Sequence, residues 1–253
     1  MTDSRNSDAW RSSASDLAPK PAYRRRILID PAAGQVTAEL EDDYHRMTVT
    51  LVHRDGIVVE VASAMKRAPW TLCRGAMARL AETFTHVALS DIARRGEKTQ
   101  NCTHLHDLAL FAAAHAADRA PTAYDIQVTD PVRDAREASL VRNGVPLLHW
   151  TIVDDRIAAP PELAGRSLRD LGDWIARQEA AGAEAGRILR WATMIARGRS
   201  IDIPAGISAT AFPAGTCFNF QPERQHDSIR LPGVDIDFSL PGREPLHDLS
   251  SRF

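Results

Sequence analysis

The amino-acid sequence predicts an α+β fold with two antiparallel β-meander segments, each followed by two helices. In residues 27–64 and again in residues 124–157, short runs of alternating apolar and polar side chains are separated by turn residues. After each of these regions the apolar spacing changes to that of amphipathic helices. The repeated order also predicts an internal duplication, with an ordinary α+β succession as the alternative. The alternative to two antiparallel segments is a single mixed sheet.

In the first half we expect about four strands and two helices. Residues 44–53 alternate in the manner of a half-buried strand, and the Asp55-Gly56 pair is typical of a hairpin turn. A helix then begins at Thr71, which we expect to be its N-cap, and another begins just after Cys102.

The second half has the same kinds of signal. Strand patterns in residues 124–153 surround an Asn143-Gly144 turn. Helices are expected from Ser167 and from about Glu184.

From Gly198 onward the chain is rich in proline and glycine and has little periodicity. The predicted organisation is a disordered tail (1–23), a single α+β domain (24–232) with halves 24–120 and 121–200 and a cover segment 201–232, and an irregular C-terminal tail (233–253). We expect removal of the residues after Pro232 to leave the protein folded.

Composition limits the classes of function. The 253 residues are 44% hydrophobic and 25% charged with a formal net charge of −2, which disfavours a nucleic-acid partner. Neither a secretory signal nor a run of about 20 apolar residues is found, so no membrane partner is expected. Three cysteines without paired spacing predict a reduced, cytoplasmic compartment. A small-molecule substrate is the expected partner. The sequence is also compatible with a homo-oligomer.

The richest concentration of reactive side chains is residues 101–107, Asn-Cys-Thr-His-Leu-His-Asp. Cys102 and His104 fall at or just before a helix N-terminus, where the helix dipole favours a thiolate or an anionic ligand. These residue types suit a metal-ligand pair, a histidine base or a cysteine nucleophile. The structural alternative is a buried Cys102 with locally satisfied histidines.

Other candidates come from outside this motif. His45 shares the strand parity of the apolar residues that follow it, so its side chain should point inward. Arg67, ahead of Trp70, is a candidate anion ligand. Cys73 lies on an apolar helical stripe, which favours a place in the core. An aromatic segment around Phe218 and Phe220 suits either a cover over a pocket or an edge strand.

Three of these stretches resemble a bacterial family called domain of unknown function 2889. They are His45-Arg46-Met47, Pro69-Trp70-Thr71-Leu72-Cys73 and Cys102-Thr103-His104-Leu105. Asn101 stands where that family usually has glycine. The resemblance covers about residues 24–118 and implies no established activity, although it suggests bacteria that degrade aromatic compounds.

The expected function is an enzyme of the lyase or proton-transfer type that acts on an aromatic or phenolic catabolite, possible products including a one-carbon fragment such as formaldehyde. The expected catalytic residues are His104 as base, His45 as second acid/base, Asp107 as orienting carboxylate and Tyr44 as a phenolate partner. The expected substrate contacts are Arg67, Trp70, Phe218 and Phe220.

Two alternatives remain open. In the first, a divalent metal such as zinc is bound by Cys102, His104 and His45 in a hydrolase or lyase; otherwise no cofactor is expected. In the second, the chain is a non-catalytic ligand-binding protein.

Overall fold

The computed structural model describes residues 20–252. Most of the expected disordered tail therefore lies outside the described residues. Its predicted end at residue 23 is wrong, because strand β1 already begins at Ala22. Ala22 and Tyr23 have no exposed surface, so the chain is part of the core from the first residues of this strand.

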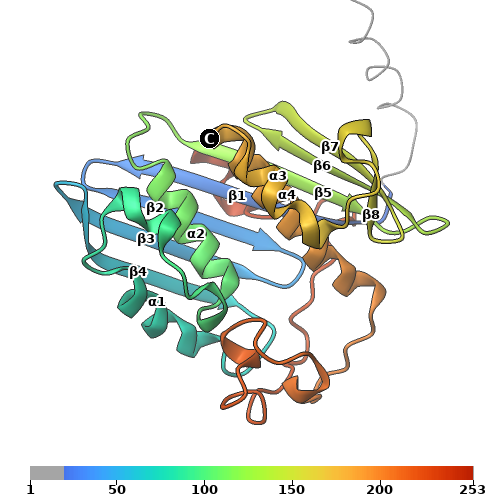
Figure 1. Ribbon diagram of the computed structural model, residues 1–253. Coiled ribbons are helices and arrows are strands. Elements are labelled where there is room, and N and C mark those ends of the chain that lie inside the picture. The colour runs from blue at the N-terminus through green and yellow to red at the C-terminus, as the bar shows by residue number, and fades with distance from the viewer. Residues whose placement is uncertain (1–19, 253) are drawn as a thin grey trace, which may run out of the picture.

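The described chain forms one antiparallel sheet of eight strands in the order β4-β3-β2-β1-β5-β6-β7-β8 (Figure 1). The strands are β1 (Ala22–Ala32), β2 (Gln35–Asp42), β3 (Arg46–Arg54), β4 (Ile57–Arg67), β5 (Thr122–Thr129), β6 (Ala135–Arg142), β7 (Val145–Val153) and β8 (Arg156–Ala159). Two four-stranded meanders thus meet through the antiparallel pairing of β1 with β5. The α+β class is confirmed, and the alternative of a mixed sheet is wrong because every neighbouring pair is antiparallel.

The hairpin turns follow from residues that tolerate positive φ. Asp55 and Gly56 have φ of 51° and 77°, and Asn143 and Gly144 have φ of 48° and 79°. Two consecutive positive φ values define the turn whose twist matches that of the flanking strands. Both turns lie where the sequence predicts them.

Four α-helices cover one face of the sheet, namely α1 (Ala76–Phe84), α2 (Thr103–Ala114), α3 (Gly172–Ala176) and α4 (Ala180–Ala196) (Figure 1). Helix α2 packs on β1, β2 and β3, whereas α4 packs on β5, β6 and β7. Four strands followed by two helices therefore occur twice along the chain. The layer between sheet and helices holds the main core.

One predicted helix start is wrong, and another holds only in part. Thr71 is not an N-cap, because its N–H donates to the carbonyl of Ile229 and the neighbouring Trp70 forms a β-bridge with Arg230. These contacts hold the backbone at Trp70, and a turn and a short 3₁₀ helix (Cys73–Gly75) then lead into α1, which begins at Ala76. At Ser167 the hydroxyl caps the chain as predicted, but the first turn is a 3₁₀ helix (Leu168–Leu171), which continues directly into the five-residue α3.

The C-terminal segment crosses to the other face of the sheet. Leu246 and Leu249 are buried there against Leu28, whose side chain points away from the main core. The backbone N–H of Leu246 donates to the Glu41 carboxylate at 2.8 Å. The segment is irregular, as predicted, but it is packed against the sheet rather than free of it.

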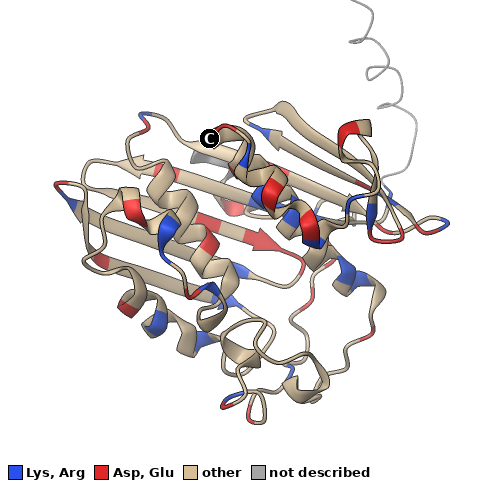
Figure 2. Ribbon diagram, in the orientation of Figure 1, with Lys and Arg blue, Asp and Glu red and all other residues tan. Residues whose placement is uncertain are grey.

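Charge is distributed without a single-sign face in the view of Figure 2, where both signs are interspersed over helices and loops. The acidic end of β2 is visible between α2 and α4. Among residues 20–252 no helix is long and apolar enough to cross a membrane.

Candidate functional site

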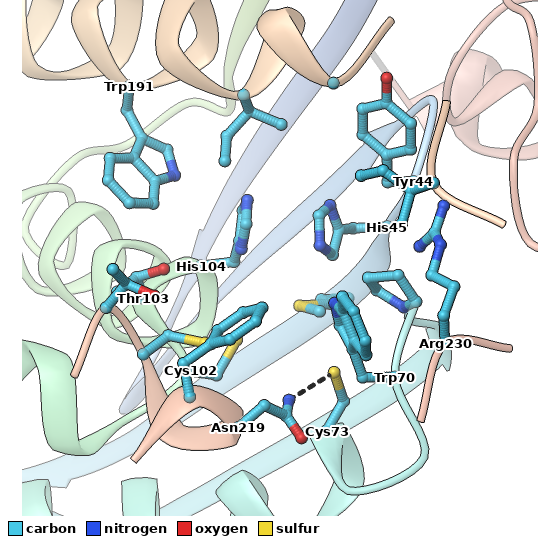
Figure 3. A pocket seen from close by; sticks show the side chains of 18 residues that line it. Tyr44, His45, Trp70, Cys73, Cys102, Thr103, His104, Trp191, Asn219 and Arg230 are labelled. Atoms are coloured by element: carbon cyan, nitrogen blue, oxygen red, sulfur yellow. Dashed lines mark hydrogen bonds between the residues drawn. The ribbon is translucent and has the colours of Figure 1, made fainter. Parts of the chain in front are cut away.

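A pocket of about 260 Å³ lies where the two halves of the helical layer meet (Figure 3). Its walls come from the loop after β2, the start of α2, the end of α4 and the segment around residues 216–220. Most of the lining is apolar or aromatic, with a few polar groups between. This composition is typical of sites for small organic ligands.

Asp42 organises the polar end of the pocket. It is the last residue of β2 and is completely buried. Its Oδ1 accepts hydrogen bonds from the backbone N–H groups of Tyr44 and His45, each at 2.8 Å, and from Nδ1 of His45 at 3.0 Å. The carboxylate thereby fixes the turn after β2 and the orientation of the His45 ring together.

The other oxygen of Asp42 accepts hydrogen bonds from two side chains of the neighbouring strand β1. Its Oδ2 accepts hydrogen bonds from the Tyr23 hydroxyl at 2.7 Å and from the Arg25 guanidinium at 2.6 Å. Burial opposes ionisation of Asp42, but the charges of His45 and Arg25 outweigh it and hold the pKa of the carboxyl well below its usual value. A charged carboxylate in this place is therefore fully compensated by its neighbours.

His104 lies directly against His45. The two ring centroids are 3.9 Å apart with an angle of 32° between the planes, so the rings are in close, tilted contact. Cys102 is the N-cap residue of α2 and has extended backbone, which puts His104 in the first turn of the helix. The Nε2 atom of His104 is buried and has no hydrogen-bond partner. Burial, followed by the nearby charges of His45 and Arg25, lowers the pKa of His104 well below its usual value.

Three side chains here could in principle share a metal ion. One ligand atom each from Asp42, His45 and His104 lies within 4.8 Å of the others, and all three residues are buried. Cys102 is not in this group, so the predicted set of metal ligands is not the set that the fold brings together. The donors fit a cation poorly, because both Asp42 oxygens already accept hydrogen bonds and Arg25 brings a positive charge.

Three of the predicted site residues, Tyr44, Trp70 and Phe220, line the pocket. Trp70 and Phe220 meet edge to face with centroids 5.3 Å apart. The Tyr44 ring packs on Tyr23 with centroids 6.2 Å apart. Burial and the charge of Asp43 raise the pKa of the Tyr44 hydroxyl, so this phenol stays protonated.

Three predicted site residues lie elsewhere. Asp107 forms an ion pair with Lys98 at 2.7 Å, and Asp42 takes the orienting role instead. Arg67 donates to the carbonyls of Asp43 and Asp42 at 2.8 and 2.6 Å, so it fixes the turn and does not face the pocket. Phe218 packs outside, under the Arg224 guanidinium, whose carbon is 4.1 Å from the ring centroid.

The cation that does line the pocket is Arg230, which sequence reasoning missed. Arg230 is 5% exposed, and its guanidinium forms an ion pair with Asp235. It comes to the pocket because its backbone forms the β-bridge to Trp70. No local pattern around residue 230 marks this long-range pairing.

All three cysteines line the same pocket, although they are far apart in the sequence. Cys73, expected in the core, is buried and accepts a hydrogen bond from the Asn219 amide at 2.9 Å. Burial raises the pKa of Cys73 to about 12 and also raises those of Cys102 and Cys217. The thiols are therefore protonated near neutral pH, which disfavours the cysteine-nucleophile alternative.

Comparison of the chain with protein-family models and with curated proteins finds no match. The resemblance to domain of unknown function 2889 consequently stays a prediction.

Proposed function

We propose that this protein is an acid–base enzyme of the lyase or proton-transfer type, acting on a small aromatic or phenolic molecule. The observation that carries the proposal is the closely packed pair His45 and His104, with Asp42 hydrogen-bonded to His45, at the polar end of an aromatic-lined pocket. Two imidazoles and a carboxylate are groups that move protons near neutral pH.

The two histidines take different roles in this proposal. Asp42 accepts the Nδ1–H of His45, which leaves Nε2 of that ring as the atom that can take a proton from a ligand. The carboxylate compensates the charge that His45 then acquires. His104 has no carboxylate partner and a lowered pKa, so it acts as a neutral hydrogen-bonding group. This order reverses the roles expected from the sequence, where His104 is the base.

In this proposal Arg230 binds the phenolate oxygen of the substrate. A buried guanidinium on the pocket wall can hold a phenolate oxygen by charge-assisted hydrogen bonds. Arg230 therefore takes the part that the sequence assigned to Arg67. An aromatic substrate would lie between this cation and the histidine pair, with Trp70 and Phe220 against its ring.

The size of the pocket agrees with a single-ring compound that carries a short side chain. A cavity of about 150 Å³ accepts benzene, and this pocket has about 260 Å³. A para-hydroxyaryl compound can lose a benzylic leaving group to give a quinone methide. Proton transfer from a neighbouring hydroxymethyl group to His45 would then convert its C–O bond to C=O and break its C–C bond. The electrons of that bond form the side-chain double bond and restore the phenolate, and formaldehyde leaves.

The test is turnover of para-hydroxyaryl compounds that carry a benzylic leaving group and a hydroxymethyl side chain, with formaldehyde and the conjugated product measured together. We expect His45→Gln to lower the rate by at least about a hundredfold, because general acid–base groups contribute about 10²–10⁴-fold. His149→Gln is the control, since that histidine lies outside the pocket with a side chain 44% exposed. Equal rates in folded wild type and His45→Gln would reject the proposed base.

A second candidate is a metal-dependent hydrolase or lyase that uses Asp42, His45 and His104, favoured by the convergence of their ligand atoms. Elemental analysis of the purified protein separates the two: stoichiometric zinc together with loss of turnover in a chelator would favour the metal enzyme. Ligand binding without turnover of any compound would favour the non-catalytic alternative. We place the protein in the cytoplasm, where its three free thiols would stay reduced.

A further inference from the structure

Two residues that line the same pocket each carry a buried polar atom without a hydrogen-bond partner. The atoms are Nε2 of His104, on α2, and Nε1 of Trp191, on α4. Buried polar groups in folded proteins nearly always have a partner, and leaving one unpaired costs about 1–3 kcal/mol. Two such atoms at one site point to a ligand that supplies the missing partners.

The two rings meet in an edge-to-face contact across the boundary between the halves of the chain. Their centroids are 5.7 Å apart and their planes meet at 66°. In Figure 3 the indole nitrogen is on the side of the Trp191 ring that faces His104 and the pocket. The Lys98 ammonium also packs on the indole, 4.5 Å from the ring centroid. Lys98 itself is bound to Asp107.

The chemistry of these atoms selects the ligand group. An indole N–H can only donate, and Nε2 of a neutral imidazole accepts when the proton is on Nδ1. A hydroxyl group satisfies both, because its oxygen accepts from Trp191 while its proton is donated to His104. A carboxylate suits the place less well, because the ionised Asp42 lies close by and the guanidinium of the pocket belongs to Arg230.

We infer that Trp191 and His104 form a subsite for an alcohol hydroxyl on the side chain of the substrate, distinct from the hydroxymethyl group whose proton His45 takes in the proposed reaction. The substrate class is then an aromatic alcohol, with its ring toward Arg230 and its hydroxyl at α2 and α4. The inference rests on the proposed function, since it refines the substrate of the same pocket. It makes Trp191 a specificity-determining residue.

The experiment compares two probes that differ in one hydroxyl, 4-hydroxybenzyl alcohol and 4-methylphenol. Their affinities are measured by titration calorimetry, and the indole N–H resonances are followed by nitrogen–proton correlation spectra. In the wild type we expect the alcohol to bind about three- to tenfold more tightly, the range of one net hydrogen bond. One indole resonance should shift with the alcohol much more than with 4-methylphenol, and it should be the resonance missing in Trp191→Phe.

Trp191→Phe keeps an aromatic ring and removes the N–H donor. We expect this variant to bind 4-hydroxybenzyl alcohol more weakly and to keep the affinity for 4-methylphenol within about twofold. The ratio of the two affinities should then approach one. Trp174→Phe is the matched control, because Trp174 packs against Trp150 and is not a pocket residue. It should keep the wild-type ratio.

An affinity ratio near one in the wild type, or a ratio that Trp191→Phe leaves unchanged, would overturn the subsite. So would the absence of binding by both probes. These outcomes leave the proposed acid–base reaction open, because that reaction is tested separately by turnover and His45→Gln. Conversely, discrimination between the probes in a protein without turnover supports the subsite and counts against the proposed reaction.

Discussion

Two histidines on α2 show how burial and neighbours set opposite protonation behaviour. His104, without a carboxylate partner, has its pKa lowered by burial and by nearby positive charges. His115, the C-cap residue of the same helix, contacts Asp118 through Nδ1 at 2.7 Å and Glu184 through Nε2 at 2.9 Å. Burial opposes its charge, but the hydrogen bonds and charges of Glu184 and Asp118 raise the pKa of His115 overall.

The sign of the resulting pH dependence follows for His115. Its folded-state pKa is above the unfolded value, so its contribution is fully present below the unfolded pKa and is lost as the pH rises through the folded pKa. We therefore expect His115→Gln to lower the free energy of unfolding more at pH 5.5 than at pH 8.5, measured by urea denaturation. His226→Gln is the control, because that side chain is exposed. An equal loss at both pH values would contradict the charged contact.

At the scale of elements, the sequence predicted strands and turns better than helix starts. The Asp55-Gly56 and Asn143-Gly144 turns were predictable because their φ requirements are local. The first helix was not, because the backbone before it is held by residues 229 and 230, which no local pattern connects to it. The internal duplication stays a prediction, since a shared order of elements does not establish common origin.

The candidate site likewise combines residues that the local sequence indicates with residues that only long-range packing brings to the pocket. His45 and His104 were predictable as reactive types near an apolar strand and a helix start. Asp42 could have been found from its position three residues before His45, where a side chain can bond the following N–H groups. Trp191 and Arg230 could not, because their place at the pocket depends on how α4 and the C-terminal region pack onto the first half.

The end of α4 also positions a pocket residue. Gly198 lies in the 3₁₀ turn that follows the helix, and a Cβ added there would be 2.9 Å from the Tyr44 hydroxyl oxygen and 3.1 Å from its Cζ. Close approach, rather than a special φ, is what requires glycine. Tyr44 and Gly198 both line the pocket.

We expect Gly198→Ala to push Tyr44 toward the pocket and weaken binding of 4-hydroxybenzyl alcohol by about fivefold or more, with a loss of about 1 kcal/mol in the free energy of unfolding. Calorimetry and urea denaturation measure the two effects. Adding Tyr44→Phe removes the closest atom and should recover part of both. Gly172→Ala, where an added Cβ meets nothing within 4 Å, should change neither.

At the scale of the whole molecule, the irregular C-terminal segment ties the two faces of the sheet together. Phe238 is buried under the Arg67 guanidinium, whose carbon is 5.8 Å from the ring centroid, and that guanidinium also donates to the carbonyl of Val234. Further on, Leu246 closes the opposite face against Leu28. Removal of residues 233–253 would expose these contacts, so we now expect the truncated chain to be destabilised, contrary to the sequence-based expectation.

A graded test of this conclusion is Leu246→Ala. The residue has no exposed surface, and its φ of 54° is unaffected because alanine keeps the Cβ atom. The substitution therefore isolates side-chain burial, and we expect it to lower the free energy of unfolding by about 2–4 kcal/mol. Leu240→Ala in the same segment should cost only about 0.5 kcal/mol, because Leu240 is 47% exposed. If urea denaturation gave equal small losses for the two variants, the C-terminal segment would not be part of the cooperative fold, and the sheet would be stable with that face open to water.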